Sequence, residues 1–232
     1  MSYEKRAQHT KLEKKLVKYN QKINLSKKEM IESSAVFLDQ LKKRRTVRDY
    51  SSKDVPLEII ENSIKAAATA PSGANQQPWH FVIVRDQMIK KEIRIAAEKE
   101  ETEFYAHKAP DEWLNALHHI GTDDKKPHLE QAPYLIIVFA ERYSLDNLNK
   151  KIKNYYVSES VGIATGMLIT ALHNAGLVTL PHTPSPMNFL RKILGRGENE
   201  RAFLILVTGF PSENATVPNI KKKDLEEYTS FF

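Results

Sequence analysis

The chain has 232 residues, 41% hydrophobic and 28% charged, and it lacks cysteine; this composition fits one globular domain and excludes disulfides and thiolate chemistry. The net charge of +6 lies entirely in residues 1–43, where eleven Lys and Arg outnumber five acidic residues; arginines and aromatics are few, so we expect a solvated face and no nucleic-acid binding. No apolar run approaches the roughly 18 residues that span a bilayer and no secretory h-region is present, so we expect no membrane contact and a cytoplasmic location.

The first part of the chain predicts three helices. Residues 1–28 carry Leu16, Tyr19 and Ile23 along one face, too little for a core of their own, so we expect this helix to pack on the body or on a second subunit. A second helix is predicted from Ser26, an N-cap candidate, to Lys43. The third runs from residue 56 to 69, with a proline in its first turn.

The rest of the chain alternates strands and helices. Helical patterns cover residues 87–120, broken at Pro110, and residues 156–174 and 189–194. Apolar runs predict strands at residues 81–84, 134–139, 177–180 and 202–209. Residues 121–127 read as a mobile loop, and the tail from residue 211 has no regular pattern. The pattern predicts an α/β domain with four or five strands and no internal repeat.

Two polar loops flank the helix predicted at residues 56–69. The first is Arg44-Arg45-Thr46-Val47-Arg48, whose guanidinium groups and hydroxyl suit a phosphate, although arginines at a helix end are also often only solvated. The second is Pro71-Ser72-Gly73-Ala74, a turn where backbone can approach a flat ligand. Neither a Walker motif nor a GxGxxG pattern is present, so ATP and Rossmann-type dinucleotide sites are unsupported.

Together, the run Arg44–Arg48 and the run Ala70–Trp79 resemble the FMN-dependent nitroreductase superfamily, and within it the iodotyrosine deiodinases. The likeness covers about residues 40–232 and includes residues 174–179 and 215–218. It implies an α/β (α+β) nitroreductase-like fold, with a central mixed, mostly antiparallel sheet of about five strands flanked by helices, in an intertwined homodimer. Residues 1–40 would be a basic helical arm that wraps the partner, and residues 41–232 the FMN-binding domain of a soluble, bacterial-type member.

The resemblance also assigns the FMN contacts. Arg44 and Lys222 match residues that hold the phosphate, although the lysine could equally be Lys221 or Lys223. Further cofactor contacts implied by position are Arg45 and Thr46 beside the phosphate, Arg48 near the pyrimidine edge, the Pro71-Ser72-Gly73 loop along the flavin, and the Thr183 hydroxyl at N5.

The resemblance implies a substrate site in a lid of about residues 101–126. Glu101 and Tyr105 share a helix face, and Lys126 lies in the polar loop that follows; these three would grip an amino-acid zwitterion. Trp113 falls where the lid carries an aromatic residue, and the Ala74 backbone N–H would donate to the phenolate oxygen of a halotyrosine. Reductive dehalogenation to tyrosine and halide is the implied reaction, with Thr183 and Ala74 closest to it. Without this frame, Glu101 and Lys126 would read as plain surface charges.

Other readings stay open. A general nitroreductase or flavin reductase using NAD(P)H directly is the main alternative, and a flavin or halotyrosine sensor is another. For the dehalogenase, electrons would come from a donor or a separate reductase that uses NAD(P)H, and no residue selects the halogen. The eight histidines show no metal-ligand spacing, so the sequence predicts no metal site.

Overall fold

The computed structural model describes residues 16–20 and 23–232 of a chain that divides into two units, Met1–Asp39 and Gln40–Phe232. In the first unit, residues 16–20 and 23–26 have no regular structure, so the helix predicted over residues 1–28 is wrong there. Residues 1–15 and 21–22 of that prediction lie outside the described ones. The helix predicted from Ser26 is confirmed as α2 (Lys27–Lys42). Its start is fixed by a reciprocal cap, since the Ser26 N–H donates to Glu29 Oε2 at 2.7 Å and the Glu29 N–H donates to Ser26 Oγ at 3.3 Å.

The second unit is built on a four-stranded sheet in the order β1-β2-β6-β5, and every neighbouring pair is antiparallel. The strands are β1 (Trp79–Val84), β2 (Tyr134–Glu141), β5 (Val178–His182) and β6 (Glu200–Gly209). The expectation of about five strands in a mixed sheet is therefore corrected to four antiparallel strands. Within the described residues, the only parallel pairing is an isolated bridge from Thr46 to Thr179 of β5, and one bridge is too short to make a fifth strand.

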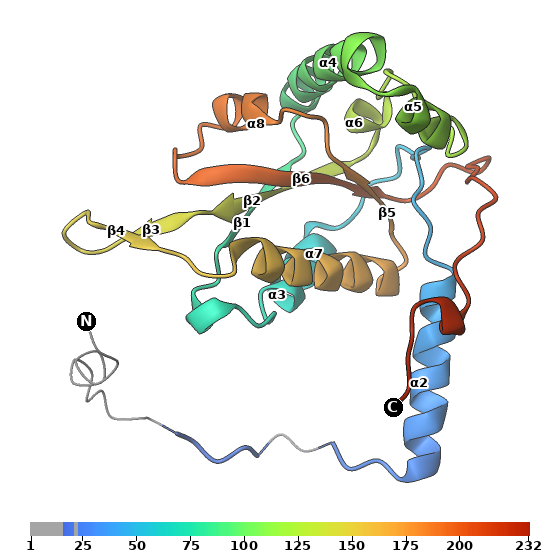
Figure 1. Cartoon of the computed structure of the whole chain (residues 1–232), viewed down its shortest axis with the longest axis vertical. Helices are drawn as coiled ribbons and strands as arrows, with labels where there is room; N and C mark the ends of the chain where they lie inside the picture. The colour runs from blue at the N-terminus through green and yellow to red at the C-terminus, as the bar shows by residue number, and fades with distance from the viewer. Residues whose placement is uncertain (1–15, 21–22) are drawn as a thin grey trace. The chain divides into compact units, whose positions relative to one another are not determined.

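Helices cover both faces of this sheet (Figure 1). One face carries α3 (Leu57–Ala67) and α7 (Val157–Asn174), and the other carries α4 (Gln87–Glu103), α6 (His128–Gln131) and α8 (Asn188–Ile193). On β2, Leu135, Ile137 and Phe139 enter one core, whereas Ile136 and Val138 enter the other. Because β2 is buried on both faces, its sequence is continuously apolar, as predicted for a central strand.

The segment between α4 and β2 contains three short helical elements, η2 (Phe104–Lys108), α5 (Asp111–His118) and α6. The helix α4 runs on into η2, a short π-helix, and then stops, so that α5 begins directly after Pro110. The break predicted at Pro110 is confirmed, because a proline ring cannot continue the hydrogen-bond ladder. Residues 121–127 connect α5 to α6 without regular structure.

Three short elements were not predicted, and the four-residue helix α6 is one of them. The hairpin of β3 (Tyr143–Leu145) and β4 (Lys151–Lys153) has strands of three residues, too short to show alternation. The tail contains one 3₁₀ turn, η3 (Leu225–Glu227), closed by its own capping box. In the described part of the chain, no helix combines the length and the apolar character needed to cross a membrane.

Candidate active site

A cavity of about 280 Å³ lies between the α4–η2–α5 segment and the end of β5. Most of the residues expected in the substrate site line it, together with two of the expected flavin contacts: Arg48, Glu101, Tyr105, Trp113, Lys126 and Thr183. They come from three separate stretches of the chain. The exposed Thr183 follows directly after β5, Arg48 follows α2, and the others belong to α4, η2, α5 and the loop before α6. The fold therefore gathers these residues around one cavity.

An ion pair of opposite charges lies in this cavity. Lys126 Nζ is 3.4 Å from Glu101 Oε2, and the two side chains are only 3% and 13% exposed. Lys126 also donates to Thr122 Oγ1 at 3.1 Å and to the Asp123 carbonyl oxygen. Burial raises the pKa of the Glu101 carboxyl, and the nearby Lys126 ammonium opposes that rise. A buried carboxylate and a buried ammonium at this spacing match the two charges of an amino-acid zwitterion.

Aromatic side chains form the outer wall of the cavity. The Trp113 ring packs edge-on against Phe104, with centroids 4.9 Å apart, and Trp113 remains 54% exposed. The Tyr105 ring lies 5.6 Å from Lys126 Nζ. Burial raises the pKa of Tyr105, so its phenol stays protonated at neutral pH and can donate a hydrogen bond. This wall is therefore apolar except for the hydroxyl group of Tyr105.

Two further histidines line the cavity, and the sequence assigned neither of them a role in the site. His128 and His182 are 4% and 7% exposed, and their rings meet edge-on with centroids 5.6 Å apart. Within residues 16–20 and 23–232, neither Nε2 atom has a hydrogen-bond partner, and His182 Nε2 is 3.9 Å from Glu101 Oε1. Burial, followed by the neighbouring cations Lys126 and Arg48, lowers the pKa of His128 to about 3; burial, His128 and the same cations lower that of His182 to about 3. Residues 54 positions apart gave no spacing signal.

This histidine pair predicts how stability depends on pH. Below pH 6.5 the unfolded chain protonates both imidazoles, whereas the folded protein does so only near pH 3, so stability is full above pH 6.5 and falls as the pH drops through this window. Each histidine contributes a slope of about 1.4 kcal/mol per pH unit. In urea unfolding between pH 7 and pH 4, His128→Gln/His182→Gln should flatten the loss. The exposed pair His118→Gln/His119→Gln is the control, and an unchanged slope in the first variant would contradict the assignment.

A second, smaller pocket of about 140 Å³ adjoins the cavity and is basic. Its lining is Arg44, Arg45, Thr46, Arg48, Ile120, Pro218, Ile220 and Lys222, and none of these described residues is acidic. Arg48 and Ile120 line both spaces, so the pocket and the cavity are neighbours. Of the three consecutive lysines, Lys222 lines the pocket while Lys221 pairs with Asp224 at 2.8 Å. Four cations without a carboxylate suit a phosphate-type anion.

The structure does not bring the predicted flavin loop to these cavities. Pro71, Ser72, Gly73 and Ala74 line neither of them. This loop forms the 3₁₀ turn η1 (Gly73–Asn75) and is tied to the start of α7, where the Gly73 N–H donates to Ser160 Oγ at 3.3 Å. It therefore lies with α7, on the sheet face opposite to α4 and α6 (Figure 1).

The exposed Ala74 has a left-handed backbone, with φ 50° and ψ 26°. Among the residues whose structure is described, none accepts a hydrogen bond from its N–H. This amide therefore points to a ligand or to solvent, as expected of a turn that approaches a flat molecule.

Glycine is required at position 73. A Cβ there would lie 2.6 Å from the Tyr155 carbonyl oxygen and 2.9 Å from Tyr156 Cδ2. Because a backbone carbonyl cannot rotate away, we expect Gly73→Ala to lower the free energy of unfolding by about 1–3 kcal/mol. Denaturant titration measures this, and a variant as stable as the wild type would show that the loop has room that the structure does not give it.

Residues 41–210 match the model of the Nitroreductase family. Iodotyrosine deiodinase of Haliscomenobacter hydrossis is 55% identical over 196 residues, which are 84% of this chain and 88% of that protein. Iodotyrosine deiodinase 1 of Homo sapiens is 42% identical over 203 residues, covering 86% of this chain and 70% of the human protein.

Solved structures agree with this result. The crystal structure of oxidized iodotyrosine deiodinase bound to FMN and 3-iodo-L-tyrosine superposes with a TM-score of 0.72 at 34% identity, over 84% of this chain and 100% of that one. A nitroreductase with bound FMN from Bacteroides fragilis gives a TM-score of 0.60 at 24% identity, over 84% and 97% of the two chains. That second likeness is one of fold alone.

Proposed function

Since the chain belongs to the nitroreductase family and, within it, to the iodotyrosine deiodinases, we propose that it binds FMN and reductively dehalogenates halotyrosines. The observation that carries the substrate class is the buried Glu101–Lys126 pair beside the basic pocket. A general nitroreductase has no need of two opposite charges in its cavity, whereas an amino-acid substrate does. In the overall reaction a carbon–hydrogen bond replaces the carbon–halogen bond, and two electrons and a proton are consumed as halide leaves.

The basic pocket fits the FMN phosphate. Arg44 and Lys222 would hold its oxygens, and Thr46 adds a hydroxyl donor. Arg48, shared by the pocket and the cavity, would lie by the pyrimidine edge of the ring system, and Thr183 by N5. When bound, FMN supplies the electrons, while the protein holds the ring and its charge.

Substrate binding would exchange one ion pair for two. In this structure Lys126 and Glu101 neutralise each other. A bound zwitterion gives its ammonium to Glu101 and its carboxylate to Lys126, and Tyr105 donates a further hydrogen bond. Because α5 and the 121–127 loop close over these contacts, water is excluded and each charged contact gains strength. Substrate affinity therefore depends on both charges being present together.

The position of the Ala74 loop supports a site that is completed by a second copy of the chain. Its free N–H suits the phenolate oxygen of a halotyrosine, yet its loop is tied to α7, on the sheet face opposite to α4, which carries Glu101. We therefore infer a homodimer in which Ser72, Gly73 and Ala74 of one subunit complete the site of the other. Light scattering should give twice the chain mass of 26.6 kDa. A monomer with full activity would contradict this arrangement.

The general NAD(P)H-dependent nitroreductase or flavin reductase is the second candidate, favoured by the family alone. We propose instead that NAD(P)H acts through a separate reductase, and that the protein works in the cytoplasm. Flavin fluorescence separates the two functions. If the protein is a halotyrosine dehalogenase, micromolar 3-iodotyrosine should quench the flavin fluorescence of the FMN-loaded protein, whereas nitrobenzene should not. Equal quenching by both compounds would favour the nitroreductase.

A further inference from the structure

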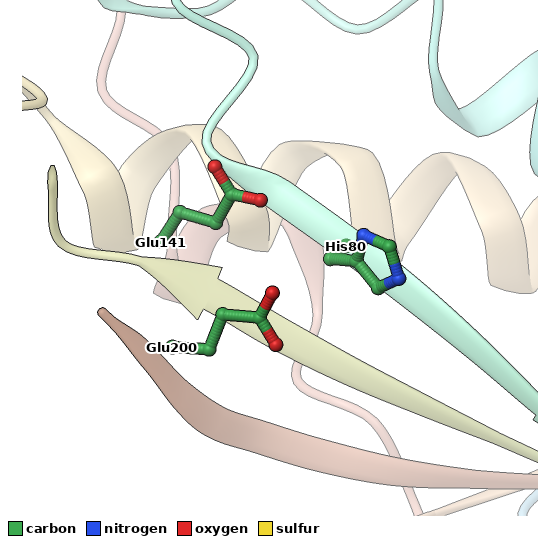
Figure 2. Close-up of side chains that lie close together, drawn as sticks. All are labelled: His80, Glu141 and Glu200. Atoms are coloured by element: carbon green, nitrogen blue, oxygen red, sulfur yellow. The ribbon is translucent and has the colours of Figure 1, made fainter. Parts of the chain in front are cut away.

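Three side chains from neighbouring strands converge at one end of the sheet (Figure 2). His80 lies on β1, Glu141 ends β2 and Glu200 begins β6. Glu141 is directly opposite Glu200, and His80 is opposite Phe139, two residues before Glu141, so all three side chains are on one face. One nitrogen and one oxygen from each carboxylate lie within 4.8 Å of one another. None of the three lines the cavity or the basic pocket.

The cluster is short of positive charge. Glu200, only 6% exposed, is held by Arg196, whose Nε and Nη2 donate to its two oxygens at 2.6 and 2.5 Å. No other described residue forms a hydrogen bond or an ion pair with the Glu141 carboxylate or the His80 imidazole. Two carboxylates and one guanidinium leave a net charge of −1 beside an imidazole. Burial lowers the pKa of His80, Arg196 adds to this effect, and Glu200 opposes it.

We propose that His80, Glu141 and Glu200 bind a divalent transition-metal ion of the Zn²⁺ class. Imidazole nitrogen and carboxylate oxygen are ligands that zinc takes in tetrahedral sites, with water in the fourth position. Ligand atoms around such an ion are about 3.3 Å apart, given metal–ligand bonds of about 2.0–2.1 Å. Rotation of the half-buried Glu141 side chain closes the remaining gap. Arg196 would act as the outer hydrogen-bond partner that orients a ligating carboxylate.

The ion would join three strands at the end of the sheet where β1 begins. His80 follows Pro78 by two residues, so the ion would also fix the backbone that leaves the Gly73 loop. This makes it a structural site, separate from the proposed redox function. The sequence alone predicted no metal, because His80, Glu141 and Glu200 are far apart in the chain and become neighbours only through the strand order β1-β2-β6.

Calorimetric titration tests the site on FMN-loaded protein without an affinity tag, dialysed against a chelator. ZnCl₂ should bind with one ion per chain at micromolar or tighter affinity, and saturation should raise the melting temperature by roughly 5 °C. His80→Gln and Glu141→Gln, made singly, should each weaken binding by about 100-fold. Their melting temperatures in chelator should match the wild type, which shows that they fold.

His118→Gln/His119→Gln is the matched control, because it removes two exposed histidines far from the cluster in sequence. It should bind Zn²⁺ as the wild type does, and millimolar Mg²⁺ should not compete, since Mg²⁺ prefers oxygen ligands. The site is ruled out if no saturable binding occurs, if His80→Gln and Glu141→Gln bind as tightly as wild type, or if the control loses the ion. None of these outcomes depends on dehalogenase activity.

Discussion

Lys126→Gln should weaken the binding of 3-iodotyrosine by about 2 kcal/mol or more, which is roughly 30-fold. The substitution removes the only cation within ion-pairing distance of Glu101 among the described lysines and arginines. It also leaves the substrate carboxylate without a partner in a closed cavity, where an unpaired charge costs most. Titration of flavin fluorescence with 3-iodotyrosine gives the dissociation constants.

Lys125→Gln is the matched control, because Lys125 is the neighbouring residue, pairs with the Asp124 carboxylate and not with Glu101 among the described residues, and is 69% exposed. It should bind 3-iodotyrosine as the wild type does. A halotyrosine analogue that keeps the ammonium but lacks the carboxylate adds a second control: it should bind Lys126→Gln at least as tightly as the wild type, because it has no carboxylate for Lys126 to hold. If Lys126→Gln binds 3-iodotyrosine as tightly as the wild type, the zwitterion assignment is wrong.

The double variant Arg44→Ala/Lys222→Ala should bind FMN on the order of 100-fold more weakly. Both cations line the basic pocket. Each substitution would remove a charge-assisted hydrogen bond to the FMN phosphate, worth about 1.5 kcal/mol or more. Arg45 is left in place because its guanidinium also donates to the Pro218 carbonyl oxygen and so holds the tail. Equilibrium titration of the apoprotein with FMN, followed by flavin fluorescence, measures the change.

Lys43→Ala/Lys223→Ala removes the same number of charges from adjacent, exposed positions and should leave FMN affinity unchanged at constant ionic strength. Riboflavin, which has no phosphate, should bind the wild type and the Arg44→Ala/Lys222→Ala variant equally. An equal loss of riboflavin affinity would show that these residues contact the ring system or support the fold, and not the phosphate.

The sequence predicted the helices and strands correctly where the apolar residues follow a clear helical or strand spacing. The run Tyr134–Phe139 predicted a central strand, and β2 is buried on both faces. Pro110 predicted the break before α5. The predictions that failed depend on contacts between distant residues. β3 and β4 are strands only because these three-residue segments pair with each other. The segment at Thr46 makes a single bridge to Thr179 and therefore does not add a fifth strand to the sheet. A local pattern reports neither event.

The part of the site that lies in recognisable sequence motifs was predictable. The arginine loop, Glu101, Tyr105 and Lys126 were expected in one site, and they line a cavity and its neighbouring pocket. The turn at Gly73 was expected in the same site, but it lies beside α7 on the other face of the sheet. Chain order alone does not say which face of a sheet a loop occupies. His128 and His182 were missed, because only the fold brings two isolated histidines into ring contact.

Iodide release tests the central claim most directly. FMN-loaded protein, reduced with dithionite without oxygen, should convert 3-iodotyrosine to tyrosine and free iodide in equal amounts over many turnovers. Lys126→Gln should do so with a raised KM, and protein without FMN should not do so at all. If the reduced, FMN-loaded wild type turns over nitroaromatics but releases no iodide from 3-iodotyrosine, the protein is a nitroreductase and the dehalogenase assignment is wrong.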